Sequence, residues 1–211
     1  EKGLQKLITE RVSKAEATQR TGRGGRVAEG QSYRLWAKAE EGTMAAFPPP
    51  EIQIADLAPL ALELAKWGSK PTQLSFLSQP PKGAWAQAQN LLSQLGALEN
   101  NRLTPHGAAL AKLPLHPRLA QMLVQAGPQA APMAALLSDR DILASRQIDL
   151  RPALVAIARG SKAHDDDIRD IEALKRIKAE AKKLSCLAPK GAFTSRLSSA
   201  QCLALAYPER V

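Results

Sequence analysis

The stretch ALENNRLTPHG, residues 97–107, decides the fold of the middle of the chain. Ala97-Leu98 and Arg102-Leu103 flank Glu99-Asn100-Asn101, and asparagine favours tight turns because it tolerates left-handed backbone angles. Thr104-Pro105 is typical of the cap and first residue of a helix, since proline is preferred at that position. This stretch predicts a small β-hairpin that leads directly into a helix.

Two helices are expected before the hairpin. Asp56 is expected to cap the apolar helix LAPLALELAKW, which Gly68 ends, and a second helix is expected over residues 81–95. The three prolines of FPPPEI, residues 47–52, continue neither a helix nor a central strand, so they mark a domain boundary. Two helices, a hairpin and a further helix are the element order of a winged-helix domain, which we predict for residues 47–115.

The rest of the chain has helical periodicity and predicts a helical bundle over residues 116–211, whose last apolar helix ends at Pro208. Its longest helix is expected over residues 165–187. Asp165 to Asp167 match the positive end of the helix dipole, and Lys182-Lys183 lie near the negative end. One apolar stripe runs along this helix and consists of Ile168, Ile171, Leu174, Ile177, Ala181 and Leu184.

The first 41 residues combine a helix signal with a strand signal. Ser13 and Glu16 fit a capping box, and the helix that they start is expected to loosen or end at the glycines of residues 22–25. QSYRLW, residues 31–36, is expected to form a strand. These signals predict a remnant of an α/β domain over residues 1–41. The chain begins without methionine or a lead-in, so we expect the preceding part of that domain to be missing and the remnant to be partly disordered or repacked.

The composition favours a polyanionic partner. The chain carries 29 Lys and Arg against 20 Asp and Glu, a net charge of +9, which favours nucleic acid above other partners. Aromatic residues make up only 4% of the chain, which argues against an aromatic platform that stacks bases. No stretch approaches the roughly 20 apolar residues of a membrane span, so we expect no membrane association and a cytoplasmic location.

The cysteines and histidines do not form a recognisable metal motif. Cys186 and Cys202 are expected to be buried thiols in a reducing compartment. His106, His116 and His164 are too far apart in the sequence for a zinc ligand set, and His106 is expected at a helix start or on the surface. The sequence predicts no metal site.

The stretch ATQRTGRGGR, residues 17–26, combines charge with backbone freedom. Arg20, Arg23 and Arg26 are spaced by three, and the arginine guanidinium is a planar fork that matches phosphate oxygens. The glycines between them let the backbone approach a ligand, and Gln19 is suited to orient an attacking water because a carboxamide both accepts and donates. An alternative is a disordered Arg-Gly tail that binds nucleic acid, but such tails are long and this run lies between a capped helix and an expected strand.

The residues QRTGRGGR, 19–26, resemble motif VI of superfamily 2 helicases in the QRxGRxGR form of the DEAH/RHA group, with Gly24-Gly25 in place of the usual Ala-Gly. Five stretches, in colinear order, resemble the HrpB-type bacterial ATP-dependent helicases: residues 7–36, 55–68, 95–123, 135–141 and 203–211. The resemblance implies the second RecA-like domain over residues 1–41, then a winged helix, then a helical ratchet-like bundle. The implied fold is therefore mainly α, with an α/β remnant.

The resemblance also implies roles for single residues. Gln19 would orient the lytic water or contact the γ-phosphate of ATP, Arg23 and Arg26 would be arginine fingers, and Arg20 would support them. Gly22 and Gly25 would contribute to the nucleotide contact. ATP and Mg²⁺ would be held by the first RecA-like domain, and the 211 residues contain neither a GxxxxGK(S/T) phosphate loop nor a DExH segment. These residues alone are therefore predicted not to hydrolyse ATP.

The expected partner is single-stranded RNA or DNA. The local candidates for phosphate contact are Lys162, Lys175, Arg176, Lys178, Lys182 and Lys183, and an ordinary solvated helix face explains the same residues equally well. The hairpin is not expected to read bases, because the winged helix of DEAH-type proteins mainly supports the other domains. The function implied is that of a DEAH-box helicase that couples ATP hydrolysis to movement. A non-catalytic nucleic-acid-binding module and a structural helical scaffold remain open as alternatives.

Overall fold

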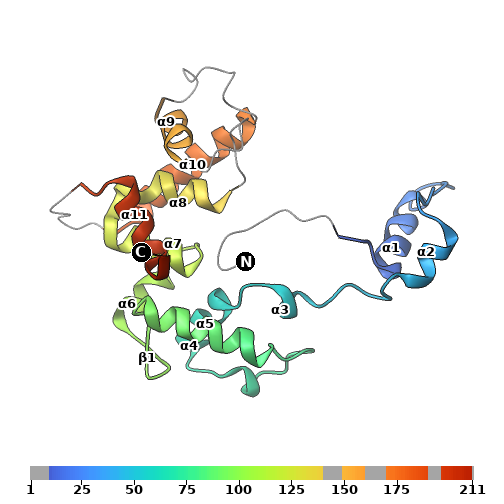
Figure 1. Cartoon of the computed structure of the whole chain (residues 1–211), viewed down its shortest axis with the longest axis horizontal. Helices are drawn as coiled ribbons and strands as arrows, with labels where there is room; N and C mark the ends of the chain where they lie inside the picture. Colours follow the sequence, from blue (N-terminus) through green and yellow to red (C-terminus); the bar gives the residue numbers. More distant parts are fainter. Residues whose placement is uncertain (1–9, 140–148, 160–169, 190–195, 211) are drawn as a thin grey trace. The chain divides into compact units, whose positions relative to one another are not determined.

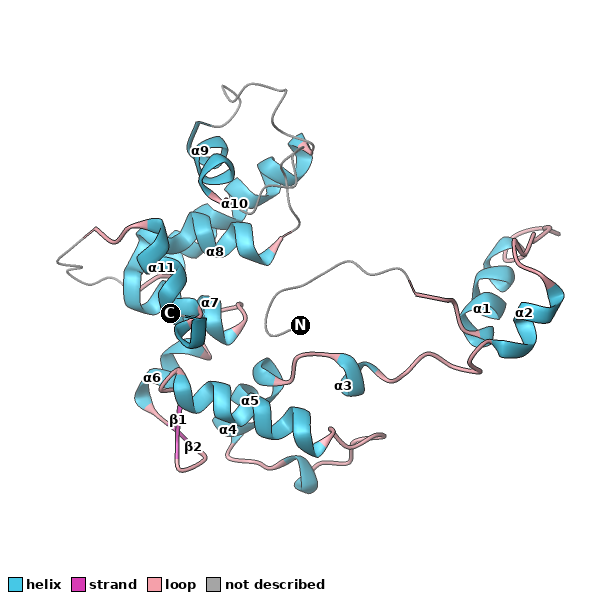
Figure 2. Ribbon diagram, in the orientation of Figure 1, coloured by secondary structure: helices cyan, strands magenta, loops and turns pink. Residues whose placement is uncertain are grey.

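The computed structural model of the chain describes residues 10–139, 149–159, 170–189 and 196–210. These residues are mainly helical, with a single two-stranded sheet among them (Figures 1 and 2). The chain divides into two compact units. The first unit comprises Glu1–Asp56 and Leu77–Pro81, and the second comprises Leu57–Phe76 and Lys82–Val211.

The first unit contains α1 (Lys14–Gly24), α2 (Lys38–Thr43) and α3 (Glu51–Ile54). The predicted capping box is confirmed: Ser13 Oγ accepts from the Glu16 amide at 3.2 Å, and the Glu16 carboxylate accepts from the Ser13 amide at 2.8 Å. The next two amides, of Lys14 and Ala15, donate to the carbonyls of Ala45 and Ala46 at 2.9 and 3.0 Å. The free amides at the start of α1 therefore have partners from two segments of the chain.

The strand predicted for QSYRLW, residues 31–36, is wrong. These residues form no strand, and the side chains of Tyr33 and Leu35 are exposed. A strand is stable when a neighbour satisfies its backbone groups and its apolar face is covered. The described part of the first unit supplies neither a pairing strand nor a cover, so residues 31–36 have a strand pattern without strand structure.

The second unit begins with the predicted pair of helices, α4 (Ala58–Trp67) and α5 (Lys82–Gln94), with a short 3₁₀ turn at Pro71–Gln73 between them. α4 is followed by Gly68 and α5 by Gly96, with φ of 70° and 68°, angles that glycine adopts without strain. The N-cap position of α4 is Leu57, one residue after the predicted Asp56, and Pro59 lies in the first turn.

The hairpin predicted from ALENNRLTPHG is confirmed as β1 (Leu98–Glu99) and β2 (Arg102–Leu103). Leu98 pairs with Leu103 and Glu99 with Arg102, and Asn100 and Asn101 have φ of 49° and 60°. Two consecutive positive φ angles are those of a type I′ turn, whose twist matches the strands that it joins.

The helix after the hairpin, α6 (Pro105–Leu110), starts as predicted, since Thr104 Oγ1 accepts from the Gly107 amide at 2.9 Å. A Cβ atom at Gly107 would lie 2.2 Å from the Ala97 carbonyl oxygen, so this glycine lets α6 pack directly against the hairpin backbone. The element order is the predicted one, and its assignment to the winged-helix class stays a prediction.

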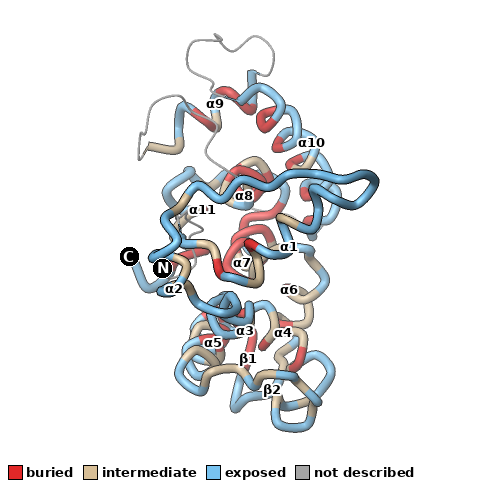
Figure 3. Tube along the Cα trace, turned by 90° about the vertical axis from the view of Figure 1, so that its right-hand side faces the viewer, coloured by how far each residue is buried: buried red, intermediate tan, exposed pale blue. Residues whose placement is uncertain are grey.

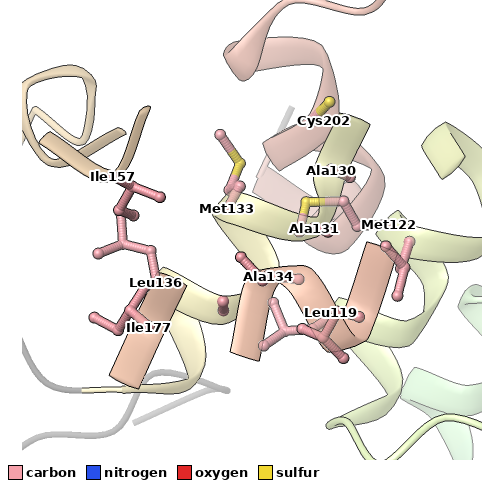
Figure 4. Packing of buried hydrophobic residues seen from close by; sticks show 14 of the residues in the cluster. Leu119, Met122, Ala130, Ala131, Met133, Ala134, Leu136, Ile157, Ile177 and Cys202 are labelled. Atoms are coloured by element: carbon pink, nitrogen blue, oxygen red, sulfur yellow. The ribbon is translucent and has the colours of Figure 1, made fainter. Parts of the chain in front are cut away.

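The remaining described residues are helical. They form α7 (Pro117–Ala126), a 3₁₀ turn (Gly127–Ala130), α8 (Ala131–Ser138), α9 (Arg151–Arg159), α10 (Ile171–Leu187), α11 (Ser199–Ala206) and a last 3₁₀ turn (Pro208–Arg210). α10 packs against α8, and α11 packs against α7. The core of the second unit lies between these helices and includes Leu119, Met122, Met133, Leu136, Ile157, Ile177 and Cys202 (Figure 4).

The apolar stripe predicted for α10 is confirmed from Leu174 to Leu184 and fails at its start. Leu174, Ile177, Ala181 and Leu184 are buried, while Ile171 is 48% exposed. α10 begins at Ile171, because Asp170 caps it by accepting from the Ala173 amide at 2.8 Å. Asp165 to Asp167 and Ile168 lie outside the described residues.

The two cysteines differ. Cys202 is buried in the core, as predicted, and burial raises the pKa of its thiol. Cys186 is exposed, so the prediction of a buried thiol is wrong there. Cys186 follows Leu184 by two residues on α10, and this spacing turns its side chain away from the core.

Candidate functional site

The motif QRTGRGGR extends over the second half of α1 and the turn that follows it. Gln19, Arg20, Gly22 and Arg23 belong to α1, and Arg26 lies in the turn. Residues four apart are neighbours on a helix surface, so Gln19 and Arg23 share one face. The opposite face carries Ala17, which is 6% exposed. The structure therefore directs the two side chains to the solvent.

The polar side chains of the motif are available to a ligand. Gln19, Arg23 and Arg26 are exposed, and the described residues offer them no hydrogen bond or ion pair. Arg20 is also exposed, and its charge lies near the Glu16 carboxylate. Hydrogen bonds from Ser13 lower the pKa of Glu16 most, and Arg20 lowers it further. Arg20 thus interacts with Glu16 within α1, whereas Arg23 and Arg26 have no such charge partner in the described ranges.

The glycines of the motif are not required by the packing of the described residues. A Cβ atom at Gly22, Gly24 or Gly25 would meet nothing within 4 Å, and none of the three has a positive φ. A glycine inside a helix costs about 1 kcal/mol relative to alanine. No contact in the described fold compensates for this cost. The glycines leave the backbone beside Arg23 and Arg26 without side chains.

A close approach of backbone to backbone shapes the turn that follows α1. A Cβ atom at Gly30 would lie 2.1 Å from the Gly24 carbonyl oxygen, a distance that no side chain tolerates. Thr21 Oγ1 lies 3.1 Å from Ser32 Oγ. The sequence indicated only a turn at Gly30 and gave Ser32 no role beyond the expected strand.

This arrangement suits an anion with several oxygen atoms. Two guanidinium groups that have no partner among the described residues, and one carboxamide, face the solvent beside glycine backbone, which fits the phosphate tail of a nucleotide. A divalent cation needs carboxylates or comparable ligands. Among the described residues, no group of three or more His, Cys, Asp or Glu could hold one. The residues therefore fit the triphosphate and do not themselves form a Mg²⁺ site.

The basic residues of α10 form a separate surface on the second unit. Lys175, Lys178 and Lys182 follow one another at three- and four-residue spacing, and all three are exposed. Figure 3 shows that buried and exposed positions alternate along α10. Lys175 is paired with Glu172 at 2.7 Å, and Arg176 lies 3.7 Å from Asp139.

Two lysines of this surface keep their charge unneutralised. Lys178 and Lys182 form no ion pair with any described residue, whereas Lys183 is paired with Glu180 at 3.2 Å. Within the described part of the chain, the predicted phosphate-contacting residues thus divide into lysines without an acidic partner and residues with one. Lys162 lies outside the described residues.

The two described histidines have structural partners. His106 lies in the first turn of α6, as predicted, and its Nε2 hydrogen-bonds to Gln121 Oε1. His116 Nδ1 accepts from the Arg118 amide at 3.3 Å and so caps α7. His164 lies outside the described residues.

The sequence did not indicate the contacts of Arg118. Its guanidinium is buried, donates to the Ala206 carbonyl at 3.2 Å and to Glu209 at 2.8 Å, and lies 5.0 Å from the Tyr207 ring centre. This arginine ties α7 to the last described residues of the chain. The signal available in the sequence was the position of Arg118 next to Pro117 in an otherwise apolar helix.

None of the helices in the described ranges is long and apolar enough to cross a membrane.

The chain resembles helicases in sequence. ATP-dependent RNA helicase HrpB of Escherichia coli (strain K12) is 40% identical over 206 residues, which cover 93% of the chain and 25% of that protein. Probable ATP-dependent RNA helicase DHX35 of Homo sapiens is 40% identical over 124 residues, which cover 57% of the chain and 18% of that protein. No protein-family model matches the chain.

Comparison with solved structures also finds helicase proteins. Two crystal structures of E. coli HrpB, one named a DExH-box NTPase and the other a DEAH/RHA helicase, match with TM-scores of 0.69 and 0.75 at 36% identity. Both matches cover 99% of this chain, and they cover 24% and 25% of the HrpB chains. The chain thus spans about a quarter of the length of these relatives. In sequence and in fold, the chain is similar to part of the HrpB-type DEAH/RHA helicase proteins.

Proposed function

We propose that the chain is the C-terminal part of an ATP-dependent DEAH-box helicase that couples ATP hydrolysis to movement along single-stranded RNA or DNA. The relatives named above are ATP-dependent RNA helicases. The observation that carries the proposal is the shared exposed face of Gln19 and Arg23, with Arg26 following it and all three free of partners among the described residues.

Arg23 and Arg26 act in this proposal as arginine fingers. Each guanidinium donates to oxygens of the terminal phosphates and stabilises the negative charge that spreads over them as the bond to the leaving group lengthens. Such a group contributes a factor of about 10³–10⁵ in rate. Gln19 accepts a hydrogen bond from the attacking water and donates another toward the phosphate, which holds the water in line.

The remaining residues of the motif have supporting roles. Arg20 adds positive charge beside Arg23, and Gly22 and Gly25 keep the backbone open so that phosphate oxygens approach closely. Bound Mg²⁺ neutralises charge on the terminal phosphates. The residues that hold it, and the phosphate loop for ATP, belong in this proposal to a first RecA-like domain that the 211 residues do not contain.

The domain assignments follow the same proposal. Residues 1–41 are a remnant of the second RecA-like domain, residues 47–115 a winged helix and residues 116–211 a ratchet-like bundle. The whole protein acts in the cytoplasm. The bundle contacts nucleic-acid phosphates through α10, chiefly through Lys178 and Lys182, whose charges no acidic side chain of the described residues offsets.

The test uses a protein that carries these residues together with a phosphate-loop domain. Arg23→Ala and Arg26→Ala should each lower kcat for ATP hydrolysis by about 10³-fold or more, because they remove charge stabilisation at the transition state. Arg11→Ala is the matched control, an exposed arginine that precedes α1, and should leave kcat unchanged. Unchanged kcat in both finger variants would overturn the proposed role of motif VI.

The 211-residue chain alone supplies a second test. It should show no Mg²⁺-dependent ATP turnover above buffer, because it contains no phosphate loop or DExH segment. Turnover that Arg26→Ala abolishes would contradict the division of the ATPase site between two domains. A chain that binds single-stranded RNA without turnover would behave as the non-catalytic module, which the missing phosphate loop favours in isolation.

A further inference from the structure

The turn that carries Arg26 is closed by backbone contact. It leaves α1 at Gly25 and returns at Gly30, where a Cβ atom would lie 2.1 Å from the Gly24 carbonyl oxygen and 2.8 Å from the Gly24 carbonyl carbon. Both distances are below any that a real Cβ atom tolerates. Gly30 has no positive φ, so glycine is required here by space and not by backbone conformation.

A hydrogen bond between the side chains of Thr21 and Ser32 also closes this turn, two residues after Gly30. Thr21 Oγ1 donates to the Ala17 carbonyl at 3.0 Å, which uses its single proton. In the 3.1 Å contact with Ser32, Ser32 Oγ is therefore the donor and Thr21 Oγ1 the acceptor. Ser32 thus fastens the chain after the turn to the third turn of α1.

The closure restricts Arg26. Consecutive Cα atoms are about 3.8 Å apart, so Arg26 lies within about 7.6 Å of Gly24 at most, and the return at Gly30 limits where the intervening residues extend. The turn is exposed, and its residues have no core to hold them. Local contacts must therefore fix its position, in contrast to Gln19 and Arg23, which the helix places.

We propose that Gly30 and Ser32 are positioning residues for Arg26: their contacts with Gly24 and Thr21 close the turn so that the Arg26 guanidinium stays beside the face formed by Gln19 and Arg23. The proposal rests on the proposed function, because it supposes that Arg26 contacts a phosphate. Gly30 and Ser32 do not touch the nucleotide themselves. A misplacement of about 1 Å at a reacting group can cost about 10²-fold in rate.

The structural test uses the 211-residue chain. Gly30→Ala should displace the backbone amide NMR signals of residues 24–32 and leave those of α4 to α11 in place, because the added methyl group has to push the turn away from Gly24. Gly42→Ala is the matched control, since a Cβ atom there meets nothing within 4 Å, and it should affect only its neighbours. If Gly30→Ala shifts no more signals than Gly42→Ala, the turn is not closed by this contact and the proposal fails.

The kinetic test uses the protein with its phosphate-loop domain. Gly30→Ala should lower kcat about 10²-fold with little change in KM for ATP, and Ser32→Ala, which removes a hydrogen bond without a clash, should lower it less. In an Arg26→Ala background, Gly30→Ala should have no further effect, whereas in an Arg23→Ala background its effect should persist. Equal effects of Gly30→Ala in both backgrounds would show general disruption of the site and overturn the positioning role.

The two proposals fail in different ways. If Arg26→Ala leaves kcat unchanged while Gly30→Ala still opens the turn in the NMR spectra, the proposed function of Arg26 is wrong and the closure is real but serves another purpose. If Arg26→Ala lowers kcat and Gly30→Ala does not, Arg26 is a finger that needs no closed turn.

Discussion

The two units of the chain are stabilised by different means. In the second unit, buried side chains from five helices and a 3₁₀ turn form one core, which includes Leu123, Ile177 and Leu184. Within residues 10–56 of the first unit, Ala17 is the single buried apolar side chain, and Leu35 is 93% exposed. The first unit is held together mainly by polar contacts. These are the Ser13 capping box, the Thr21–Ser32 hydrogen bond and the exposed ion pair between Arg34 and Glu41.

The two units differ in how much apolar surface they bury within themselves. Burial of apolar area is the main favourable term in folding, and polar contacts at the surface each add about 1 kcal/mol or less. The second unit has its own core. The first unit presents Val27, Tyr33, Leu35, Phe47 and Ile54 to solvent, which are side chains suited to packing against more of a domain. Arg20, Arg23 and Arg26 therefore lie on the unit with the weaker internal support.

The largest expected effect is the loss of core packing in the second unit. Leu184 is 0% exposed, and Leu184→Ala should lower the free energy of unfolding by about 2–5 kcal/mol, because it removes buried methyl groups and leaves a cavity. Leu35→Ala, the same substitution in the first unit, should change it by less than about 0.5 kcal/mol. Thermal and urea unfolding followed by circular dichroism measure both. Comparable losses in the two variants would show that the first unit has a core of its own.

The next effect is the dependence of the second unit on acid. The hydrogen bond from Arg118 lowers the pKa of Glu209, so the folded carboxyl group titrates below its unfolded value. The stability from this pair is present above the unfolded pKa, about 4.3, and is lost as pH falls through the folded pKa. Glu209 is partly exposed, so the effect should be about 1 kcal/mol.

Urea unfolding of the wild type and of Glu209→Gln between pH 3 and 7 tests this dependence. The variant should be less stable at pH 7 and should lose less stability on acidification. Glu41→Gln is the control in the first unit, where the partner Arg34 is exposed, and should leave the unfolding of the second unit unchanged. Identical pH profiles for wild type and Glu209→Gln would contradict the role of Arg118.

The sequence predicted the elements that local rules control. The capping box at Ser13, the hairpin turn at Asn100 and Asn101 and the glycine ends of α4 and α5 each depend on a few neighbouring residues, and all are present. The colinear stretches on both sides of QRTGRGGR also predicted the resemblance to HrpB-type helicases. The exposed face of Gln19 and Arg23 follows from helical spacing, once α1 was predicted to pass through them.

Features that depend on distant residues were not predictable. QSYRLW has the pattern of a strand, but pairing requires a neighbour that no local pattern reports. Cys186 lies in an apolar sequence context, and its exposure depends on which side of α10 packs against α8. The contact of Gly30 with Gly24 and the link from Arg118 to Glu209 join residues whose proximity follows only from the folded backbone.

Two equivalent caps sharpen the comparison between the units. Ser198 and Gln201 form a capping box at α11, as Ser13 and Glu16 do at α1. Each serine-to-alanine substitution should cost about 0.5–2 kcal/mol. α11 is anchored in the core by Cys202, so Ser198→Ala should lower the global unfolding temperature. Ser13→Ala should leave that transition unchanged and instead speed amide hydrogen exchange in residues 14–24, because α1 opens locally.

Hydrogen exchange followed by mass spectrometry, together with calorimetry, separates the two outcomes. Faster exchange in α1 of the Ser13→Ala variant at an unchanged transition temperature supports independent units. If Ser13→Ala lowers the transition temperature as much as Ser198→Ala, the two units unfold together, and the weak internal support of the first unit is compensated by contact with the second.

The smallest expected effect concerns the charges on α10. Lys182→Ala should weaken binding of single-stranded RNA and reduce the slope of log affinity against log salt by about 0.7, the value for one lost phosphate contact on a single strand. Lys183→Ala is the matched control, because Glu180 already neutralises that lysine, and should change the slope less. Both variants are tested in the 211-residue chain by fluorescence anisotropy at several salt concentrations. Equal slopes for the two variants would identify the face of α10 as an ordinary solvated surface, and would leave the arginines of the first unit as the better-supported anion site of the chain.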